Sequence, residues 1–358
     1  MYSIGASKSS NSKMNDYDQK DAIANMLRQR FPEQTYEMIT SLASWFADVK
    51  NRARHKNVSI GTKFLNLMET VFRCPWIIET IQGLTDAHDF ASSIPNISRL
   101  ASTNSLLGKG SYGAVYSGVL HDDTAVAVKK YTHLDKANLH TNMCDWNVCM
   151  KEIAMLSKLQ GSGIVGELYG VGWLHNSWII LMQRHSLESI AWAKHELWSI
   201  ERTKQIVLDL FGAVRSVHEL TGHVHGDVKP CNVMLDFVDN DKVKVWLIDF
   251  GLSEPIGVIE KGHQYFQTMF WRSPELLDNK PCDLVAADLW ATAITAFDIM
   301  AGKHVMCDFG ANSATTDAKM MAILQANVLG RESIPDEWNI HQELLDLAND
   351  LFRLYVVR

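Results

Sequence analysis

The sequence lacks the cysteine patterns of a disulfide-stapled or zinc-binding protein. Its six cysteines form no Cys-x-x-Cys pair, and residues 1–20 are polar, without the apolar stretch of a signal peptide. We therefore expect reduced thiols and a cytoplasmic or nuclear location. Metal binding by histidine is not expected either, because His185, His195 and His263 have no ligand-type partners at helical spacing.

Long apolar runs are also absent. A membrane helix needs about 20 mostly apolar residues, whereas one of the longer uncharged runs, 289–297, ends at Asp298. Hydrophobic residues make up 47% of the chain and charged residues 21%, which is typical of globular protein. Residues 1–104 carry twelve Lys/Arg against ten Asp/Glu, and the remainder carries twenty-two against thirty-one. An acidic main body argues against nucleic acid as a partner, and no membrane partner is expected.

The N-terminal part of the chain divides into three stretches. Residues 1–20 are rich in Ser, Asn and Lys, and we expect a flexible tail. Residues 21–90 are predicted to be helical, because apolar residues such as Ile23 and Leu27 recur at helical spacing. Residues 91–104, rich in Ser, Asn and Ala, are expected to be a linker. Core packing explains the helical faces most simply, and a regulatory protein bound there is the alternative.

From residue 105 to 358 the pattern changes. Short β-like runs come first, at 114–116, 124–128 and 178–182. After Ser199 the pattern turns helical, with apolar residues at 3–4 residue spacing over 206–217. Strands followed by helices predict an α+β domain with a small β-rich lobe and a larger helical lobe.

The first motif with chemical content is a glycine-rich stretch. Gly108, Gly110 and Gly113 form the pattern G-x-G-x-x-G. In dinucleotide-binding folds this pattern opens a helix, whereas here β-like residues follow, which favours a hairpin. Glycines let backbone amides approach phosphates closely, and Val115 would then cover an adenine.

A lysine at the end of an apolar strand is the second signal. Lys129 follows Val126, Ala127 and Val128, and a buried ammonium is costly unless it is paired. Nucleotide phosphates would pair it, and Glu152 on a predicted helix is the best carboxylate to hold it. An exposed strand end is the alternative.

Three further motifs follow in a fixed order. They are His-Gly-Asp-Val-Lys-Pro-Cys-Asn at 225–232, Asp-Phe-Gly at 249–251, and Ser-Pro-Glu at 273–275 followed by Asp-Leu-Trp at 288–290. With these motifs, residues 106–358 resemble the eukaryotic-type protein kinase superfamily. The resemblance implies a bilobal kinase fold that transfers a phosphoryl group from ATP to a protein substrate.

The resemblance also implies roles for single residues. Asp227 would be the catalytic base, and Lys229, which is typical of Ser/Thr kinases, would lie beside the transferred phosphate. Asn232 and Asp249 would hold Mg2+ through their oxygens. The Lys129–Glu152 pair would align the α- and β-phosphates.

The adenine site and the internal packing are implied in the same way. Val115, Ala127 and Met234 would enclose the adenine. The residue at the back of the nucleotide site would be Leu181 or Met182. A buried stack would contain Leu156, His225 and Phe250.

One departure concerns regulation. The family usually has arginine where this chain has Gly226, and that arginine normally binds a phosphate on the activation segment. Residues 263–275 resemble the proline-directed group of cyclin-dependent, mitogen-activated and dual-specificity tyrosine-regulated kinases. Tyr265 falls where several of them carry phosphotyrosine, and we predict that its phosphate would contact Arg272. The resemblance also predicts that Glu275 pairs with Arg358.

The resulting hypothesis is an ATP- and Mg2+-dependent serine/threonine protein kinase. The alternative is a pseudokinase, a nucleotide-binding scaffold that acts through its N-terminal helices. A small-molecule kinase on a related fold is disfavoured by the Ser-Pro-Glu and Asp-Leu-Trp motifs.

Overall fold

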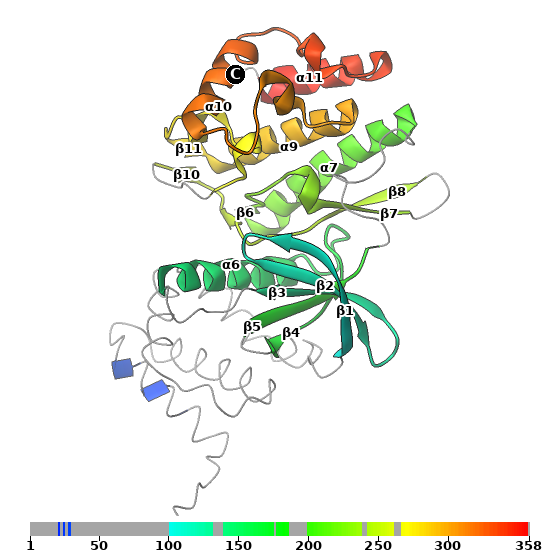
Figure 1. The fold of residues 1–358 in the computed structure, drawn as a ribbon, viewed down its shortest axis with the longest axis vertical. Coiled ribbons are helices and arrows are strands. Elements are labelled where there is room, and N and C mark those ends of the chain that lie inside the picture. Colours follow the sequence, from blue (N-terminus) through cyan, green and yellow to red (C-terminus); the bar gives the residue numbers. More distant parts are fainter. Residues whose placement is uncertain are drawn as a thin grey trace, which may run out of the picture.

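A computed structural model describes most of the chain from Leu100 onward. The described residues are 100–131, 139–174, 177–185, 199–237, 242–260 and 266–356, together with Asp21, Ala24, Asn25, Arg28 and Gln29. Figure 1 shows two lobes, a sheet flanked by helix α6 and, beyond it, a larger group of helices around α7 and α9. The α+β architecture expected from the sequence, with a small β-rich lobe and a larger helical lobe, is confirmed.

The small lobe is a five-stranded antiparallel sheet with the order β1-β2-β3-β5-β4. Its elements are β1 (Leu100–Gly110), β2 (Gly113–Leu120), β3 (Ala125–Tyr131), α6 (Leu139–Lys158), β4 (Leu168–Leu174) and β5 (Ser177–Gln183). Side chains alternate across each strand. Val126 and Val128 therefore join one apolar cluster with Leu181, and Lys129 and Tyr131 point to the opposite face.

The large lobe is built on two long helices. Its helices are α7 (Ile200–Thr221), α8 (Pro274–Leu277), α9 (Leu284–Ala301), α10 (Asp317–Asn327) and α11 (Leu345–Tyr355). Helix α7 begins after Ser199, whose hydroxyl accepts from the Arg202 amide, and ends at Gly222 with φ 67°. The predicted apolar face over 206–217 is buried against the core.

Helix α9 is unusually apolar. Among the described residues it is the one helix long and apolar enough to cross a membrane, with a mean hydropathy of 1.5. However, 78% of it is buried inside the lobe. Burial on all sides is what an apolar central helix of a folded domain shows.

Short strands and 3-10 turns complete the large lobe. The strands are β6 (His223–Val224), β7 (Val233–Phe237), β8 (Val243–Leu247), β9 (Glu254–Pro255), β10 (Val258–Ile259) and β11 (Cys282–Asp283). They pair as β6–β9, β7–β8 and β10–β11. The 3-10 turns are η3 (Pro230–Asn232), η4 (Met269–Trp271), η5 (Val305–Phe309), η6 (Asp336–Trp338) and η7 (Gln342–Leu344).

The boundary of the domain differs from the sequence expectation. Strand β1 begins at Leu100, inside the stretch 91–104 that its composition suggested was a linker. Residues 102–110 of β1 are exposed, and β1 is an edge strand, so polar residues are tolerated there. The predicted tail 1–20 lies outside the described residues, as do most of 21–90. The five described residues there are helical, and Ala24 is buried in the main core cluster.

Candidate active site

A buried aspartate of α9 fixes the backbone of the loop that follows β6. Asp288 is fully buried, and its two carboxylate oxygens accept from the amides of His225 (2.9 Å) and Gly226 (3.0 Å). His218 of α7 adds a contact of 2.8 Å to the same carboxylate. Burial alone would raise the pKa of Asp288, but His218, followed by His225 and the Gly226 amide, outweighs burial and lowers the pKa. The carboxylate therefore stays ionised and anchors the loop.

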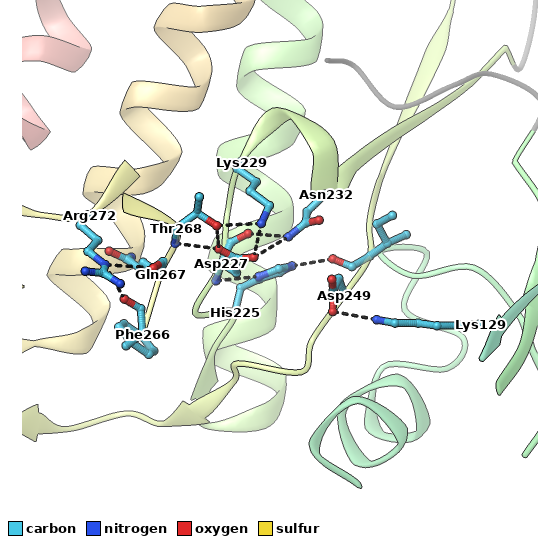
Figure 2. Close-up of polar contacts among 11 residues, drawn as sticks. Lys129, His225, Asp227, Lys229, Asn232, Asp249, Phe266, Gln267, Thr268 and Arg272 are labelled. Atoms are coloured by element: carbon cyan, nitrogen blue, oxygen red, sulfur yellow. Dashed lines mark hydrogen bonds and ion pairs between the residues drawn. The ribbon is translucent and has the colours of Figure 1, made fainter. Parts of the chain in front are cut away.

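The anchored loop presents Asp227, whose carboxylate is buried and fully hydrogen-bonded (Figure 2). Its Oδ2 accepts from Lys229 Nζ (2.6 Å) and Asn232 Nδ2 (3.1 Å). Its Oδ1 accepts from the amide (2.9 Å) and hydroxyl (2.7 Å) of Thr268. Lys229 also donates to the Thr268 hydroxyl at 2.7 Å. The Asp227 carboxylate is thus held in one orientation by Lys229 and Asn232, which are close to it in sequence, and by Thr268, which is 41 residues away.

The expected pair of Lys129 with Glu152 is present between β3 and α6. Lys129 Nζ lies 2.5 Å from Glu152 Oε2 and 2.8 Å from Asp249 Oδ1. The Lys129 and Glu152 side chains are 10% and 2% exposed, whereas Asp249 is 35% exposed. Lys129 therefore bridges the buried carboxylate of Glu152 on α6 and the partly exposed carboxylate of Asp249.

Charge balance explains the pKa directions in this cluster. Burial disfavours the charged form of Lys129, but Asp249 and Glu152 outweigh burial and raise its pKa. Burial raises the pKa of Glu152, with Asp249 adding to the effect and Lys129 opposing it. Burial also tends to raise the pKa of Asp249, but the charge of Lys129 and its hydrogen bond have the larger effect and lower this pKa. Lys129 and Asp249 are therefore charged at neutral pH.

Two site residues were missed by the sequence reasoning. Tyr131 of β3 is buried, and its hydroxyl donates to Glu152 Oε2. Its position two residues after Lys129 on one strand was the available signal, since such residues share a face. Thr268 bonds Asp227 across 41 residues of sequence, and no local pattern indicates that contact.

The Asp-Phe-Gly segment has a strained backbone. Asp249 has φ 66°, a left-handed conformation that costs a non-glycine residue about 1–2 kcal/mol. Phe250 is fully buried, and its ring lies 4.6 Å from that of His225. Leu156 is buried in the same cluster. A strained backbone at a residue that contacts Lys129 is typical of a functional site.

The glycine motif forms the predicted hairpin between β1 and β2. Gly108 pairs with Val115, and Gly110 pairs with Gly113. A Cβ atom at Gly113 would lie 2.2 Å from the Lys130 carbonyl oxygen, so that position requires glycine. The second strand of the hairpin, β2, is the sheet neighbour of β3, the strand that carries Lys129.

The two candidates for the back of the expected nucleotide site lie on opposite faces of the small-lobe sheet. Leu181 packs in the cluster on the opposite face of the sheet. Met182 pairs with Ala127 and packs against the main core, on the same face as Lys129. Met234 lies on β7, half-buried, two residues after Asn232. The alternation of β5 therefore favours Met182.

Asn232 and Asp249 suit a divalent cation by their chemistry. Both offer oxygen donors, which Mg2+ prefers. Among the described residues no group of three or more His, Cys, Asp or Glu could hold a metal alone, so nucleotide phosphates would have to complete the coordination. The site has one more negative than positive side chain, so binding of a cation is favourable. The lysines are Lys129 and Lys229, and the carboxylates are Glu152, Asp227 and Asp249.

Position 226 has no room for a side chain. Gly226 has φ 82°, and a Cβ atom there would lie 2.2 Å from the Leu252 carbonyl oxygen. Its own carbonyl accepts from the Gln267 amide at 3.2 Å. The backbone geometry thus accounts for the absence of the arginine that is usual in the family.

Arg272 holds the end of the activation segment, residues 249–275. Its Nε donates to the carbonyls of Phe266 (3.1 Å) and Gln267 (3.0 Å), and its Nη1 donates to Asp317 Oδ1 (3.1 Å). The guanidinium is therefore already engaged without a phosphotyrosine. Tyr265 and Arg358 lie outside the described residues, so the predicted contacts Tyr265–Arg272 and Glu275–Arg358 stay predictions.

Comparison with known proteins agrees with this geometry. Residues 101–356 match the family of the protein kinase domain. This match covers well over half of the chain, and the chain belongs to the protein kinase family.

Several curated kinases are similar to the chain. Mitogen-activated protein kinase kinase kinase 3 of Arabidopsis thaliana is 29% identical over 240 residues, 64% of this chain and 38% of that protein. Cyclin-dependent kinase-like 1 of Caenorhabditis elegans is 31% identical over 202 residues, 56% of this chain and 54% of that protein. Serine/threonine-protein kinase cst-1 of the same organism is 25% identical over 206 residues, 56% of this chain and 38% of that protein. The chain thus spans 38% to 54% of the length of these relatives.

Proposed function

We propose that this chain is a serine/threonine protein kinase that transfers the γ-phosphoryl group of ATP to hydroxyls of protein substrates. One observation carries the proposal: the buried Asp227 carboxylate is oriented by Lys229, Asn232 and Thr268. A carboxylate fixed in this way is already oriented, and it can accept the proton of an incoming hydroxyl once that hydroxyl replaces one of its four donors. The names of the relatives, among them serine/threonine-protein kinase cst-1, support the same activity.

The proposed mechanism depends mainly on positioning and electrostatics. Asp227 receives the proton from the substrate hydroxyl, and Lys229 neutralises charge that develops beside it. Thr268 contacts both residues and fixes their separation. Lys129, oriented by Glu152, offers its ammonium to phosphate oxygens. Each group acts from a position set by hydrogen bonds that already exist.

The nucleotide would lie beneath the glycine hairpin. Gly108, Gly110 and Gly113 expose backbone amides to phosphates, and the adenine would contact Val115 and Ala127, with Met182 behind it and Met234 below. Mg2+ held by Asn232 and Asp249 would neutralise phosphate charge. The excess of one carboxylate in the cluster supports this assignment.

A transfer assay with radiolabelled ATP and a basic protein substrate tests the proposal. Phosphate should appear on serine or threonine, and Asp249→Ala should lower the rate by at least about a hundredfold. Equal incorporation by wild type and Asp249→Ala would refute the activity. The alternative would then stand, a nucleotide-binding scaffold that acts through its N-terminal helices.

Proline-directed specificity is a finer proposal. It is supported by the sequence of residues 266–275 and by similarity to cyclin-dependent kinase-like 1. Arg272 binds the Phe266 and Gln267 carbonyls, which shapes the segment that would receive the residue after the phosphorylated one. Peptides that differ only in Ser-Pro against Ser-Ala should differ at least about tenfold in kcat/KM. Equal rates would exclude this specificity.

The remaining expectations concern partners and location. Ala24 belongs to the buried cluster that includes residues of α6, which supports a role for the N-terminal helices, alone or with a regulatory protein, in positioning that helix. The described cysteines, Cys149, Cys231, Cys282 and Cys307, form no disulfide with one another, which supports a cytoplasmic or nuclear location. Fractionation of expressing cells with an antibody to the chain tests the location.

A further inference from the structure

Helix α6 contacts the activation segment at two points besides the Glu152 site. Val148 packs so close to Gly251 that a Cβ atom at 251 would lie 2.3 Å from its Cγ1. Lys151, one turn further along the helix, forms an ion pair with Glu254 of β9. Residues three and four apart are neighbours on a helix surface, so Val148 lies next to both Lys151 and Glu152 on α6.

Glu254 is fixed by the backbone of the large lobe. Glu254 pairs with Val224 in the short β6–β9 ladder. Two residues later, the amide of Ile256 donates to the Gly222 carbonyl at 2.9 Å. Strand β6 runs directly into His225, the first residue of the catalytic loop, residues 225–232. The Lys151–Glu254 pair therefore joins the helix that carries Glu152 to the strand beside the catalytic loop.

The environment makes this pair stronger than an ordinary surface pair. The Lys151 and Glu254 side chains are only 13% and 24% exposed, so solvent and salt screen them little. The arginine that is usual at position 226, which would bind a phosphate on the activation segment, is absent, because Gly226 has no room for a side chain. In this chain the Glu254 carboxylate provides the negative charge instead, and it binds Lys151 of α6 to the activation segment.

We propose that Lys151 and Glu254 are positioning residues which hold the Glu152 helix in its active place without a phosphate on the activation segment. The proposal rests on the proposed kinase activity and concerns how that activity is maintained. If the pair breaks, α6 loses its tie to β9, and Glu152 no longer holds Lys129 firmly toward the phosphates.

Charge reversal separates this role from general stability. Lys151→Glu and Glu254→Lys each place two like charges together, and the double variant restores an opposite pair with exchanged ends. Arg215→Glu is the matched control, because Arg215 forms an exposed pair with Glu219 on α7, far more open to solvent. Each variant of the full chain is measured for kcat and KM of ATP and for hydrogen exchange of amides 151–158. Wild type treated with phosphatase, and verified by mass spectrometry, is measured alongside.

The expected results are specific. Each single reversal should lower kcat/KM for ATP by about tenfold and speed exchange in 151–158, and the exchanged pair should recover most of both. Arg215→Glu and dephosphorylated wild type should stay within about twofold of untreated wild type.

Three outcomes would overturn the inference: single reversals that match wild type, an exchanged pair no better than the singles, or an active wild type silenced by dephosphorylation. If wild type transfers no phosphate, the proposed kinase activity fails. If hydrogen exchange of amides 151–158 is nevertheless faster in the single reversals and restored in the exchanged pair, the proposal that Lys151 and Glu254 position α6 stands. The two proposals can therefore fail separately.

Discussion

Replacing Gly226 by alanine tests whether the catalytic loop requires glycine. Because Gly226 has φ 82°, an alanine there would adopt a left-handed backbone conformation, which should destabilise the fold by about 1–2 kcal/mol. Its Cβ would also lie 2.2 Å from the Leu252 carbonyl oxygen and 3.0 Å from Phe266 Cε2. Because the nearest atom is backbone, relief requires the loop or the Asp-Phe-Gly segment to shift, so a further cost of about 1–3 kcal/mol is expected.

Gly222 provides a matched control in the same part of the chain. It has φ 67°, but a Cβ atom added there would meet no other atom within 4 Å, so Gly222→Ala isolates the backbone cost. Each kcal/mol should lower Tm by about 2–4 °C in a protein of this size. We therefore expect Gly226→Ala to melt several degrees below Gly222→Ala.

Activity gives a second and independent measurement. Asp227 follows Gly226 directly, and a shifted backbone would disturb the Asp288 anchor and the hydrogen bonds to Thr268. Gly226→Ala should therefore lower kcat by at least about tenfold, since small misplacements of catalytic groups are costly. Equal melting temperatures for the two variants, together with wild-type turnover in Gly226→Ala, would refute this account of the loop.

Three further perturbations follow from the buried cluster and the catalytic loop. Lys129→Met should abolish transfer while the fold survives, because burial already raises the pKa of Glu152 and the unpaired carboxyl can protonate; unchanged turnover would exclude the assigned role. Tyr131→Phe removes a donor to Glu152 and should cost about 1–3 kcal/mol, with a raised KM for ATP; a thermal melt and ATP titration check both. Burial lowers the pKa of His225, whose Nδ1 accepts from the Asp227 amide at 3.2 Å and must stay unprotonated. Below about pH 6.5 the unfolded chain gains a proton that the folded one does not, so stability should fall as pH falls, by at most about 1.4 kcal/mol per pH unit for this residue. His225→Phe should show a shallower dependence in melts between pH 7.5 and 5.5, and an identical slope would contradict the assignment.

Local patterns were sufficient for much of the architecture. The β-like runs at 114–116 and 178–182 fall within β2 and β5, and the run 124–128 begins one residue before β3. The apolar period over 206–217 is the buried face of α7. The glycine spacing predicted a hairpin because strands follow it, and that hairpin is present. These features depend on residues close together in the sequence, where side-chain period and glycine geometry act directly.

Composition misled the assignment at one boundary. The polar residues after Leu100 looked like a linker, but they form the exposed edge strand β1. An edge strand needs little burial on its outer side, so its composition approaches that of a loop.

The sequence by itself determined which chemical groups this protein brings to its site: the glycine hairpin, Lys129, Asp227, Asn232 and Asp249. It also allowed Glu152 to be chosen as the partner of Lys129, through resemblance to the kinase family. These assignments depend on motif order along the chain, which folding does not alter.

Only the tertiary structure decided how the groups are held. Thr268 reaches Asp227 across 41 residues, and Lys151 reaches Glu254 across 103. The need for glycine at 226 comes from the Leu252 carbonyl, which belongs to another segment. Contacts of this kind leave no period in the sequence, because the two partners meet only after the helix, the catalytic loop and the activation segment have packed together.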